Sequence, residues 1–265
     1  MTHPTPTLKR LAALAVLAAL MALVASSAMA DEALDAAFEA LGTYRFGDDR
    51  AALQPINDAV TATHGDADAR AKLEERLAAV LATDARHAAK DFACRKLRLI
   101  GTADSVPALA KLLTDEKLSH MGRYALEWIP GEESQAAMRT AMGETEGELK
   151  IGMINSLGVR RDEAATAELT KLLDGDNPQI AAAAAAALGS IGTPAAAAAL
   201  KGFLADAPEE LQLAAADAYL ASAEQLLADG NKIQAMVIYK TLAQGDRPKH
   251  IRVAAMRGLL AAAKK

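Results

Sequence analysis

The chain has 265 residues, of which 52% are apolar and only 3% are aromatic. Its 29 Lys and Arg stand against 34 Asp and Glu, a formal net charge of −5. Nucleic-acid binding needs concentrated Lys and Arg, so this mildly acidic composition without a long basic run argues against a nucleic-acid partner. The single cysteine, Cys94, excludes an internal disulfide, and its apolar neighbours predict an inert buried thiol.

The first thirty residues have the pattern of a secretory signal. Lys9 and Arg10 precede an unbroken apolar run of fifteen residues, 11–25, and small residues ending in A-x-A follow up to Ala30. We therefore expect cleavage after Ala30 and a periplasmic or extracellular protein. The alternative is a membrane anchor, but the apolar run is shorter than the ~20 residues of a spanning helix.

The next part, 31–85, predicts an irregular helical cap. Residues 32–42 indicate a helix that ends at Gly42, and a second helix follows that Pro55 interrupts and kinks. Residues 67–83 predict an amphipathic helix with leucines along one side. A cap of this kind covers the open side of a terminal unit in a repeat stack.

From Ala93 to Ala205 one helical pattern returns about every thirty residues. The apolar residue that begins each corner marks the period: Leu97, Leu126, Leu157 and Leu188 are 29, 31 and 31 residues apart, and Tyr219 follows 31 later. Val, Ile and Thr never gather into alternating runs, so no strand is predicted. A fixed period of this size indicates stacked helical hairpins and an all-α fold.

Turn and capping residues separate the two helices of each unit. The corners lie at 101–104, 130–131, 160–162 and 192–194. Asn177 and Thr193 each precede a proline, which predicts a helix N-cap followed by proline at the first helical position. The almost pure alanine stretch 181–187 predicts the closest helix approach in the stack.

The last portion departs from the period. Around Gly230, with Ala235 and Tyr239 at helical spacing, a longer hairpin resembles a tetratricopeptide unit, and the next marker is Leu259. A final helix is predicted over 250–264 with no partner helix after it. Either it caps the stack, or a second chain covers it, so a homo-oligomer through this helix is one possibility.

The sequence A-L-G-S-I-G at 187–192, followed by an alanine-rich helix, resembles HEAT repeats of the short, bilin-lyase-like type. The similarity covers 86–225 well and 249–265 in part. The segments KDFACRKLRLIGTADSVPALAKLL and INSLGVRRD resemble secreted HEAT-repeat proteins of environmental bacteria. The resemblance implies a right-handed α-solenoid over 86–265 and a protein-binding scaffold without a cofactor.

Catalytic motifs are not expected. HEAT-repeat deoxyhypusine hydroxylases bind two irons through His-Glu pairs, but Glu follows none of the five histidines. The sequence has no H-E-x-x-H, no Gly-rich phosphate loop and no G-x-S-x-G. We therefore predict no catalytic, cofactor-binding or metal-binding residue. A metal-dependent oxidoreductase is a remote alternative that would require His87, His120 and His250 to converge with carboxylates.

One segment concentrates residues that are common in binding hot spots. Residues 118–130 contain His120, Arg123, Tyr124 and the only tryptophan, Trp128. They are a candidate partner contact. The interpretation we prefer is that Tyr124 and Trp128, four residues apart on one helix face, fill a gap between units.

A second candidate is a ladder of basic residues on the second helices: Lys111, Arg139, Lys171 and Lys201. Second helices line the concave face in HEAT solenoids, so these residues could form a basic stripe there; the alternative is a solvated helix face. The corner residues Arg160, Arg161 and Asp162 indicate either a tie between units or an anion-binding pair. The function predicted is a non-catalytic scaffold that binds a protein on its concave face. The alternative is an accessory subunit of an exported hydrolase or redox enzyme.

Overall fold

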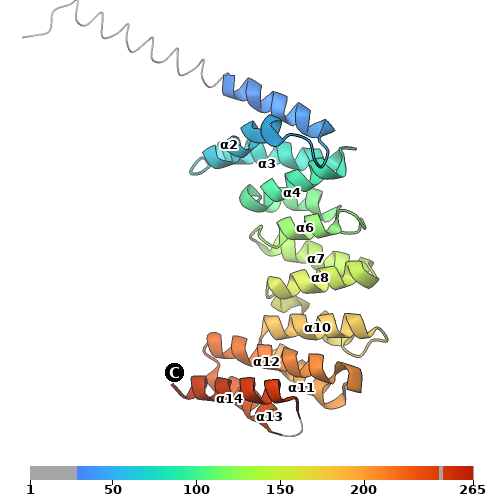
Figure 1. Ribbon diagram of the computed structural model, residues 1–265, viewed down its shortest axis with the longest axis vertical. Helices are drawn as coiled ribbons and strands as arrows, with labels where there is room; N and C mark the ends of the chain where they lie inside the picture. The colour runs from blue at the N-terminus through green and yellow to red at the C-terminus, as the bar shows by residue number, and fades with distance from the viewer. Residues whose placement is uncertain (1–28, 245–246, 265) are drawn as a thin grey trace, which may run out of the picture. The chain divides into compact units, whose positions relative to one another are not determined.

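The computed structural model describes residues 29–244 and 247–264 (Figure 1). Apart from residues 29 and 30, the predicted signal segment lies outside the described residues. The described part contains helices and turns and no strand, and none of its helices is long and apolar enough to cross a bilayer. The chain divides into two compact units, one ending at Lys96 and one beginning at Leu97. Each is described by itself.

The first unit is built from helices connected by short turns. After the helical residues 29–43 come the 3₁₀ turn η1 (Arg50–Leu53), α2 (Gln54–Ala62), α3 (Ala67–Ala82) and most of α4 (His87–Ile100). The first helix ends at residue 43, one residue after the predicted end at Gly42. Pro55 does not kink a helix: it occupies the first turn of α2, where a missing N–H costs nothing. The amphipathic helix predicted over 67–83 is confirmed as α3, which buries Leu73, Leu77 and Leu81.

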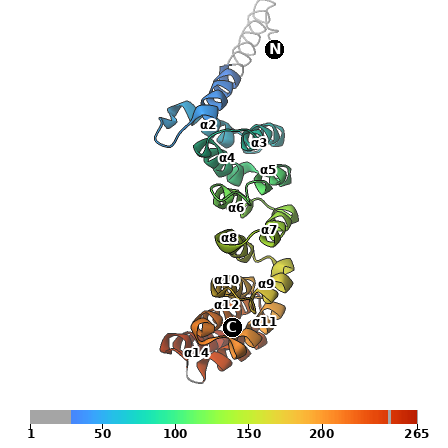
Figure 2. The ribbon, with the colours of Figure 1, turned by 90° about the vertical axis from the view of Figure 1, so that its right-hand side faces the viewer.

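The second unit is a stack of helical hairpins. Its first helices are α6 (Ser119–Leu126), α8 (Gly147–Val159), α10 (Pro178–Ile191) and α12 (Gln212–Ala228), and its second helices are α5 (Val106–Ala110), α7 (Glu132–Glu144), α9 (Thr166–Leu172), α11 (Pro194–Asp206) and α13 (Lys232–Ala243). The 3₁₀ turns η2 (Ala103–Ser105), η3 (Glu163–Ala165) and η4 (Glu209–Leu211) each lead directly into a helix, and α14 (Lys249–Lys264) ends the order. Figure 2 shows α6, α8 and α10 in one layer and α7, α9 and α11 in the other. This arrangement confirms the all-α solenoid.

The thirty-residue period places the same kind of residue in the core of each unit. Leu97, Leu126, Leu157 and Leu188 are fully buried, and Tyr219 is 3% exposed. The polar caps form as predicted: the Asn177 side chain accepts hydrogen bonds from the backbone N–H groups of residues 179 and 180, and Thr193 accepts one from residue 196. Capping side chains satisfy N–H groups that the helix leaves without partners.

The first helices approach one another more closely than the second helices do. A Cβ added to Gly158 would lie 2.9 Å from Cα of Ala187, and one added to Gly189 would lie 2.6 Å from the carbonyl oxygen of Ala218. The backbones of α8, α10 and α12 therefore pack directly, as the alanine stretch predicts. In contrast, α7, α9 and α11 contact one another much less.

This difference overturns one expectation. A stack bends toward the layer whose members are closer together, so from α8 to α12 the concave side is lined by first helices. Figure 2 shows the second helices on the outer side of this bend. The expectation that second helices form the concave face is therefore wrong for this stretch.

The longer hairpin near the C-terminus is confirmed as α12 and α13. Gly230 at the turn has a φ of +87°, a region that favours glycine, and Ala235 and Tyr239 are buried where the hairpin closes. Helix α14 packs against this hairpin through Ile251 and Ala255, which are fully buried.

Candidate functional site

Trp128 lies on the surface, immediately after α6, with 61% of its area exposed. The preferred interpretation, that it fills a gap between units, is therefore wrong for this residue. The guanidinium carbon of Arg98 lies 4.2 Å from the centre of the Trp128 ring and 4.7 Å from that of Tyr124, which is half-buried. The cation covers part of the two rings and fixes their position.

Trp128 is one of three exposed apolar side chains at equivalent positions of successive units. Leu99, Trp128 and Val159 each follow a buried marker leucine by two residues, and they are 58%, 61% and 66% exposed. We call these three residues the apolar ladder. At the equivalent positions of the next two units stand Ser190 and Ala221, so the ladder ends at α8.

The members of the ladder are linked by their sequence neighbours. Arg98, next to Leu99, contacts the Trp128 ring. Arg160, next to Val159, donates hydrogen bonds to the carbonyl oxygens of Glu127 (3.2 Å) and Ile129 (2.7 Å), on either side of Trp128. The three apolar side chains therefore lie along one edge of the first-helix layer.

Arg123 connects the two helices at whose C-terminal ends Trp128 and Val159 lie. Its Nη1 donates to the carbonyl oxygen of Gly152 (3.2 Å) and to Oγ of Ser156 (3.1 Å) on α8, and Ser156 in turn donates to Glu127 (2.7 Å). Burial lowers the pKa of the Arg123 guanidinium. Arg123 therefore ties α6 to α8, while His120, at the start of α6, is exposed.

The corner arginines tie successive units, as one of the two sequence interpretations predicts. Arg160 reaches back to the C-terminal carbonyls of α6 and to that of Gly131 (3.0 Å). Arg161, with a φ of +52°, reaches forward to the carbonyl oxygen of Ile191 (3.2 Å) and pairs with Asp229 after α12. The hydrogen bond from Arg161 lowers the pKa of the Asp229 carboxyl.

The four residues of the basic ladder lie on or directly after second helices, in the other layer from the apolar ladder. Arg139 pairs with Asp162 (2.6 Å) and with Glu132, and Lys171 pairs with Glu168 (2.7 Å). Lys111 and Lys201 are exposed, and Lys201 borders a shallow apolar groove that Ile233 and Val237 also line. Half of the ladder is therefore neutralised by carboxylates of the chain itself, and the two candidate sets do not form one surface.

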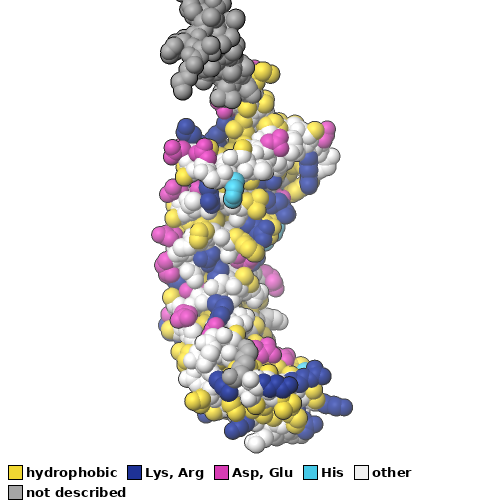
Figure 3. Space-filling model, turned by 90° about the vertical axis from the view of Figure 1, so that its left-hand side faces the viewer, with side chains coloured by type: hydrophobic (Ala, Val, Ile, Leu, Met, Phe, Trp, Pro, Cys, Tyr) yellow, Lys and Arg dark blue, Asp and Glu magenta, His cyan; other side chains and the backbone are white. Residues whose placement is uncertain are grey.

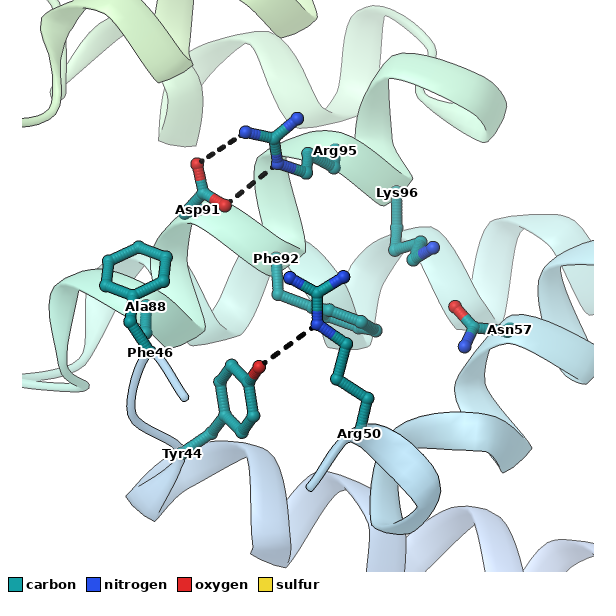
Figure 4. Close-up of a pocket in the computed structure, with 9 residues that line it drawn as sticks. All are labelled: Tyr44, Phe46, Arg50, Asn57, Ala88, Asp91, Phe92, Arg95 and Lys96. Carbon is teal, nitrogen blue, oxygen red and sulfur yellow. Dashed lines mark hydrogen bonds and ion pairs between the residues drawn. The ribbon is translucent and has the colours of Figure 1, made fainter. Parts of the chain in front are cut away.

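The first unit contains a cavity of about 440 Å³ that the sequence pattern does not predict (Figure 4). It is lined by Tyr44, Phe46, Arg50, Asn57, Ala88, Asp91, Phe92, Arg95 and Lys96. Figure 4 shows Arg95 turned to Asp91, with the two groups 2.9 Å apart, and Arg50 donating to the Tyr44 hydroxyl at 3.3 Å. The Lys96 ammonium lies 4.9 Å from the Phe92 ring centre, and burial lowers its pKa. Each cation contacts a neighbour within this unit, so the polar groups do not converge on a common ligand position.

Two further expectations concern reactive groups. Cys94 is fully buried, and burial, with a smaller effect of Asp91, raises the pKa of its thiol to about 12, which fits an inert side chain. Among the described residues, no group of three or more His, Cys, Asp or Glu side chains could hold a metal ion.

Comparison with known proteins bears on the repeats. A family model described as HEAT repeats matches residues 135–219, the stretch that runs from α7 through α8, α9, α10 and α11 to about the middle of α12. Residues 135–219 therefore form HEAT repeats. No curated protein matches the chain.

The solved structures to which the chain is similar include two of very different description. An archaeal HEAT-like repeats protein from Thermococcus onnurineus NA1 is 13% identical, with a TM-score of 0.49, covering 86% of this chain and 96% of that one. Human deoxyhypusine hydroxylase, in complex with glycerol, is 16% identical, with a TM-score of 0.34, covering 73% of this chain and 98% of that one. At such scores neither similarity carries an argument about function.

Proposed function

We propose that the protein is an exported, non-catalytic scaffold whose HEAT repeats bind a protein partner through the apolar ladder. The observation that carries this proposal is the exposure of Leu99, Trp128 and Val159 at equivalent positions of three successive units. Fully burying a Leu or Val side chain stabilises a complex by about 1.5–3 kcal/mol, and aromatic residues bury still more area. A row of three such side chains on a soluble protein is a feature that a partner surface would explain.

The contacts that three arginines make around the apolar ladder explain how such a surface could bind with little entropic cost. Arg98 holds the Trp128 ring, Arg123 joins α6 to α8, and Arg160 fixes the backbone on both sides of Trp128. A surface that is already ordered loses little conformational freedom on binding, so more of the contact energy appears as affinity. Export is part of the proposal and rests on the sequence of residues 1–30.

The test is affinity capture from an envelope extract, followed by binding measurements with the captured protein. Replacing Trp128 and Val159 with alanine should weaken binding by roughly thirtyfold or more, because a central aromatic anchor contributes the largest share of interface energy. The matched control replaces Ile233 and Val237 on α13, which are also exposed apolar residues, 80% and 52%. That variant should bind like the wild type.

Three results would contradict the proposal: no captured protein, equal loss in both variants, or full binding by the ladder variant. A captured partner that proves to be an exported hydrolase or redox enzyme would make the protein an accessory subunit, the alternative function. A charge-reversed variant of Lys111 and Lys201 tests the basic ladder in the same assay. Because this ladder lies in the other helix layer, we expect it to leave binding unchanged.

A further inference from the structure

The charges of the chain are unevenly distributed at its C-terminal part. Residues 247–265 contain six Lys and Arg and no Asp or Glu. The rest of the chain contains 23 Lys and Arg and all 34 Asp and Glu. A segment of strongly positive charge is therefore attached to a strongly negative remainder. Figure 3 shows Lys and Arg side chains gathered at the end of the molecule that carries α13 and α14.

Helix α14 exposes apolar side chains on the face opposite its core contacts. It buries Ile251, Ala255 and Ala262, whereas Val253, Met256 and Leu260 are 36%, 51% and 66% exposed. The spacing of three and four residues places the exposed three on one stripe along the helix. The stripe lies at the middle of the solvent-facing side, where a helix of a soluble protein normally places its most polar residues.

Basic side chains border this stripe on both sides. At 3.6 residues per turn, Arg257 and Lys264 fall on one side of it and Arg252 on the other, with Lys249 at its beginning. All four are exposed, and within the described part of the chain none of them forms an ion pair with a carboxylate. The exposed face of α14 therefore combines an apolar centre with unneutralised cations at its margins.

We propose that α14 docks on an anionic phospholipid bilayer. The helix lies along the surface, with Val253, Met256 and Leu260 inserted between the headgroups and its Lys and Arg side chains at the lipid phosphates. Interfacial helices have this order of residues, because long basic side chains extend from the apolar margin to the charged headgroups. None of the described helices is long and apolar enough to span a bilayer.

The shape and charge of the surface favour a bilayer over a protein. The stripe lies on the outer side of one helix, and a protein partner would need an apolar groove with acidic margins to cover it. An anionic bilayer offers both chemistries without such a groove. The inference is independent of the proposed scaffold function, since the apolar ladder lies on α4, α6 and α8 and this face lies on α14.

The test measures co-sedimentation of residues 31–265 with lipid vesicles. The first thirty residues are left out because their own apolar run would bind lipid, and every described helix is retained from residue 31 onward. We expect binding to vesicles that contain phosphatidylglycerol, loss of binding in high salt, and no binding to pure phosphatidylcholine. Replacing Met256 and Leu260 with glutamine should lower the partition coefficient roughly tenfold.

The matched control replaces Ile233 and Val237 with glutamine, which removes two exposed apolar side chains of similar exposure from the adjacent helix α13. This variant should keep wild-type vesicle binding, and circular dichroism should show equal helicity for all three proteins. Failure of the wild type to bind anionic vesicles overturns the proposal, as does equal binding by the α14 variant. A concentration-dependent dimer that the α14 substitutions abolish, without vesicle binding, would assign the face to a second copy of the chain instead.

Discussion

At the scale of single residues, the adjacent Arg160 and Arg161 show how one corner serves two neighbouring units. A helix leaves its last carbonyl groups without intrahelical partners, and those at the end of α6 are met by Arg160 from the next unit. Arg161 extends in the other direction to the end of α10. The sequence indicates that this pair either joins units or binds an anion. Only the folded structure distinguishes these, because the partners are backbone carbonyls about thirty residues away.

Removing the donor at Arg160 should destabilise the stack measurably. Arg160→Met keeps most of the aliphatic stem but deprives the carbonyls of Leu126, Glu127 and Ile129 of a shared donor. We expect the free energy of unfolding in urea to fall by about 2 kcal/mol, since an unmet buried polar group costs about 1–3 kcal/mol. Arg252→Met on the exposed face of α14 is the control and should change stability by less than about 0.5 kcal/mol. Equal stability of the two variants would show that water replaces Arg160 without cost.

At the scale of the element, glycine and alanine set the spacing of the first helices. Gly158 and Gly189 occupy the positions where α8 meets α10 and α10 meets α12. The sequence predicted this close approach from the alanine stretch 181–187. It did not predict the direction in which the stack bends, because that depends on the spacing of both layers at once.

A single methyl group distinguishes glycines that permit close packing from those that do not. Gly189→Ala would place its Cβ 2.6 Å from the Ala218 carbonyl oxygen, so α10 and α12 must separate. We expect a loss of about 1–3 kcal/mol in unfolding free energy, the usual cost of overpacking. Gly202, inside α11, has no atom within 4 Å of the equivalent position. Gly202→Ala should therefore stabilise the protein, by up to about 1 kcal/mol, because alanine favours the helix.

Thermal or urea unfolding of both variants checks this pair of predictions. We expect the unfolding free energy to fall for Gly189→Ala in α10 and to rise for Gly202→Ala in the neighbouring α11. If Gly189→Ala were also stabilising, the close approach of α10 and α12 would not limit the stack.

At the scale of the whole molecule, the thirty-residue period predicts the fold. The candidate site, in contrast, depends on which apolar side chains are exposed, and the period does not give this. The marker residues from Leu97 to Tyr219 are buried as their spacing required, because each repeat places the same position in the core. Trp128 could not be assigned in the same way. A large aromatic near a corner is compatible with a filled gap or a free surface, and the choice depends on how far α6 extends before the turn. The apolar ladder could have been found by comparing the residues two positions after each marker.

The N-terminal sequence predicts the compartment in which the protein is found. A short basic segment, an apolar run of fifteen residues and small residues at 28 and 30 predict export and processing. We expect the mature protein to begin at Asp31 when the full chain is expressed in a bacterial host and recovered from the periplasm. N-terminal sequencing and intact mass measure this directly.

The signal peptidase accepts only small residues at the positions before the cut, which provides a selective test. Ala30→Leu should leave the precursor uncleaved and retained at the membrane by its apolar run, whereas Ala33→Leu, three residues after the cut, should be processed normally. Cytoplasmic recovery of the wild type with residues 1–30 intact would contradict export. A cytoplasmic protein would not meet envelope proteins. That result would therefore also exclude the envelope as the place to seek the protein that binds the apolar ladder. Processing at Asp31 would instead place the ladder and α14 in a compartment that membrane lipid borders, where one helix could hold the scaffold at the surface while the first-helix edge remains open to a partner.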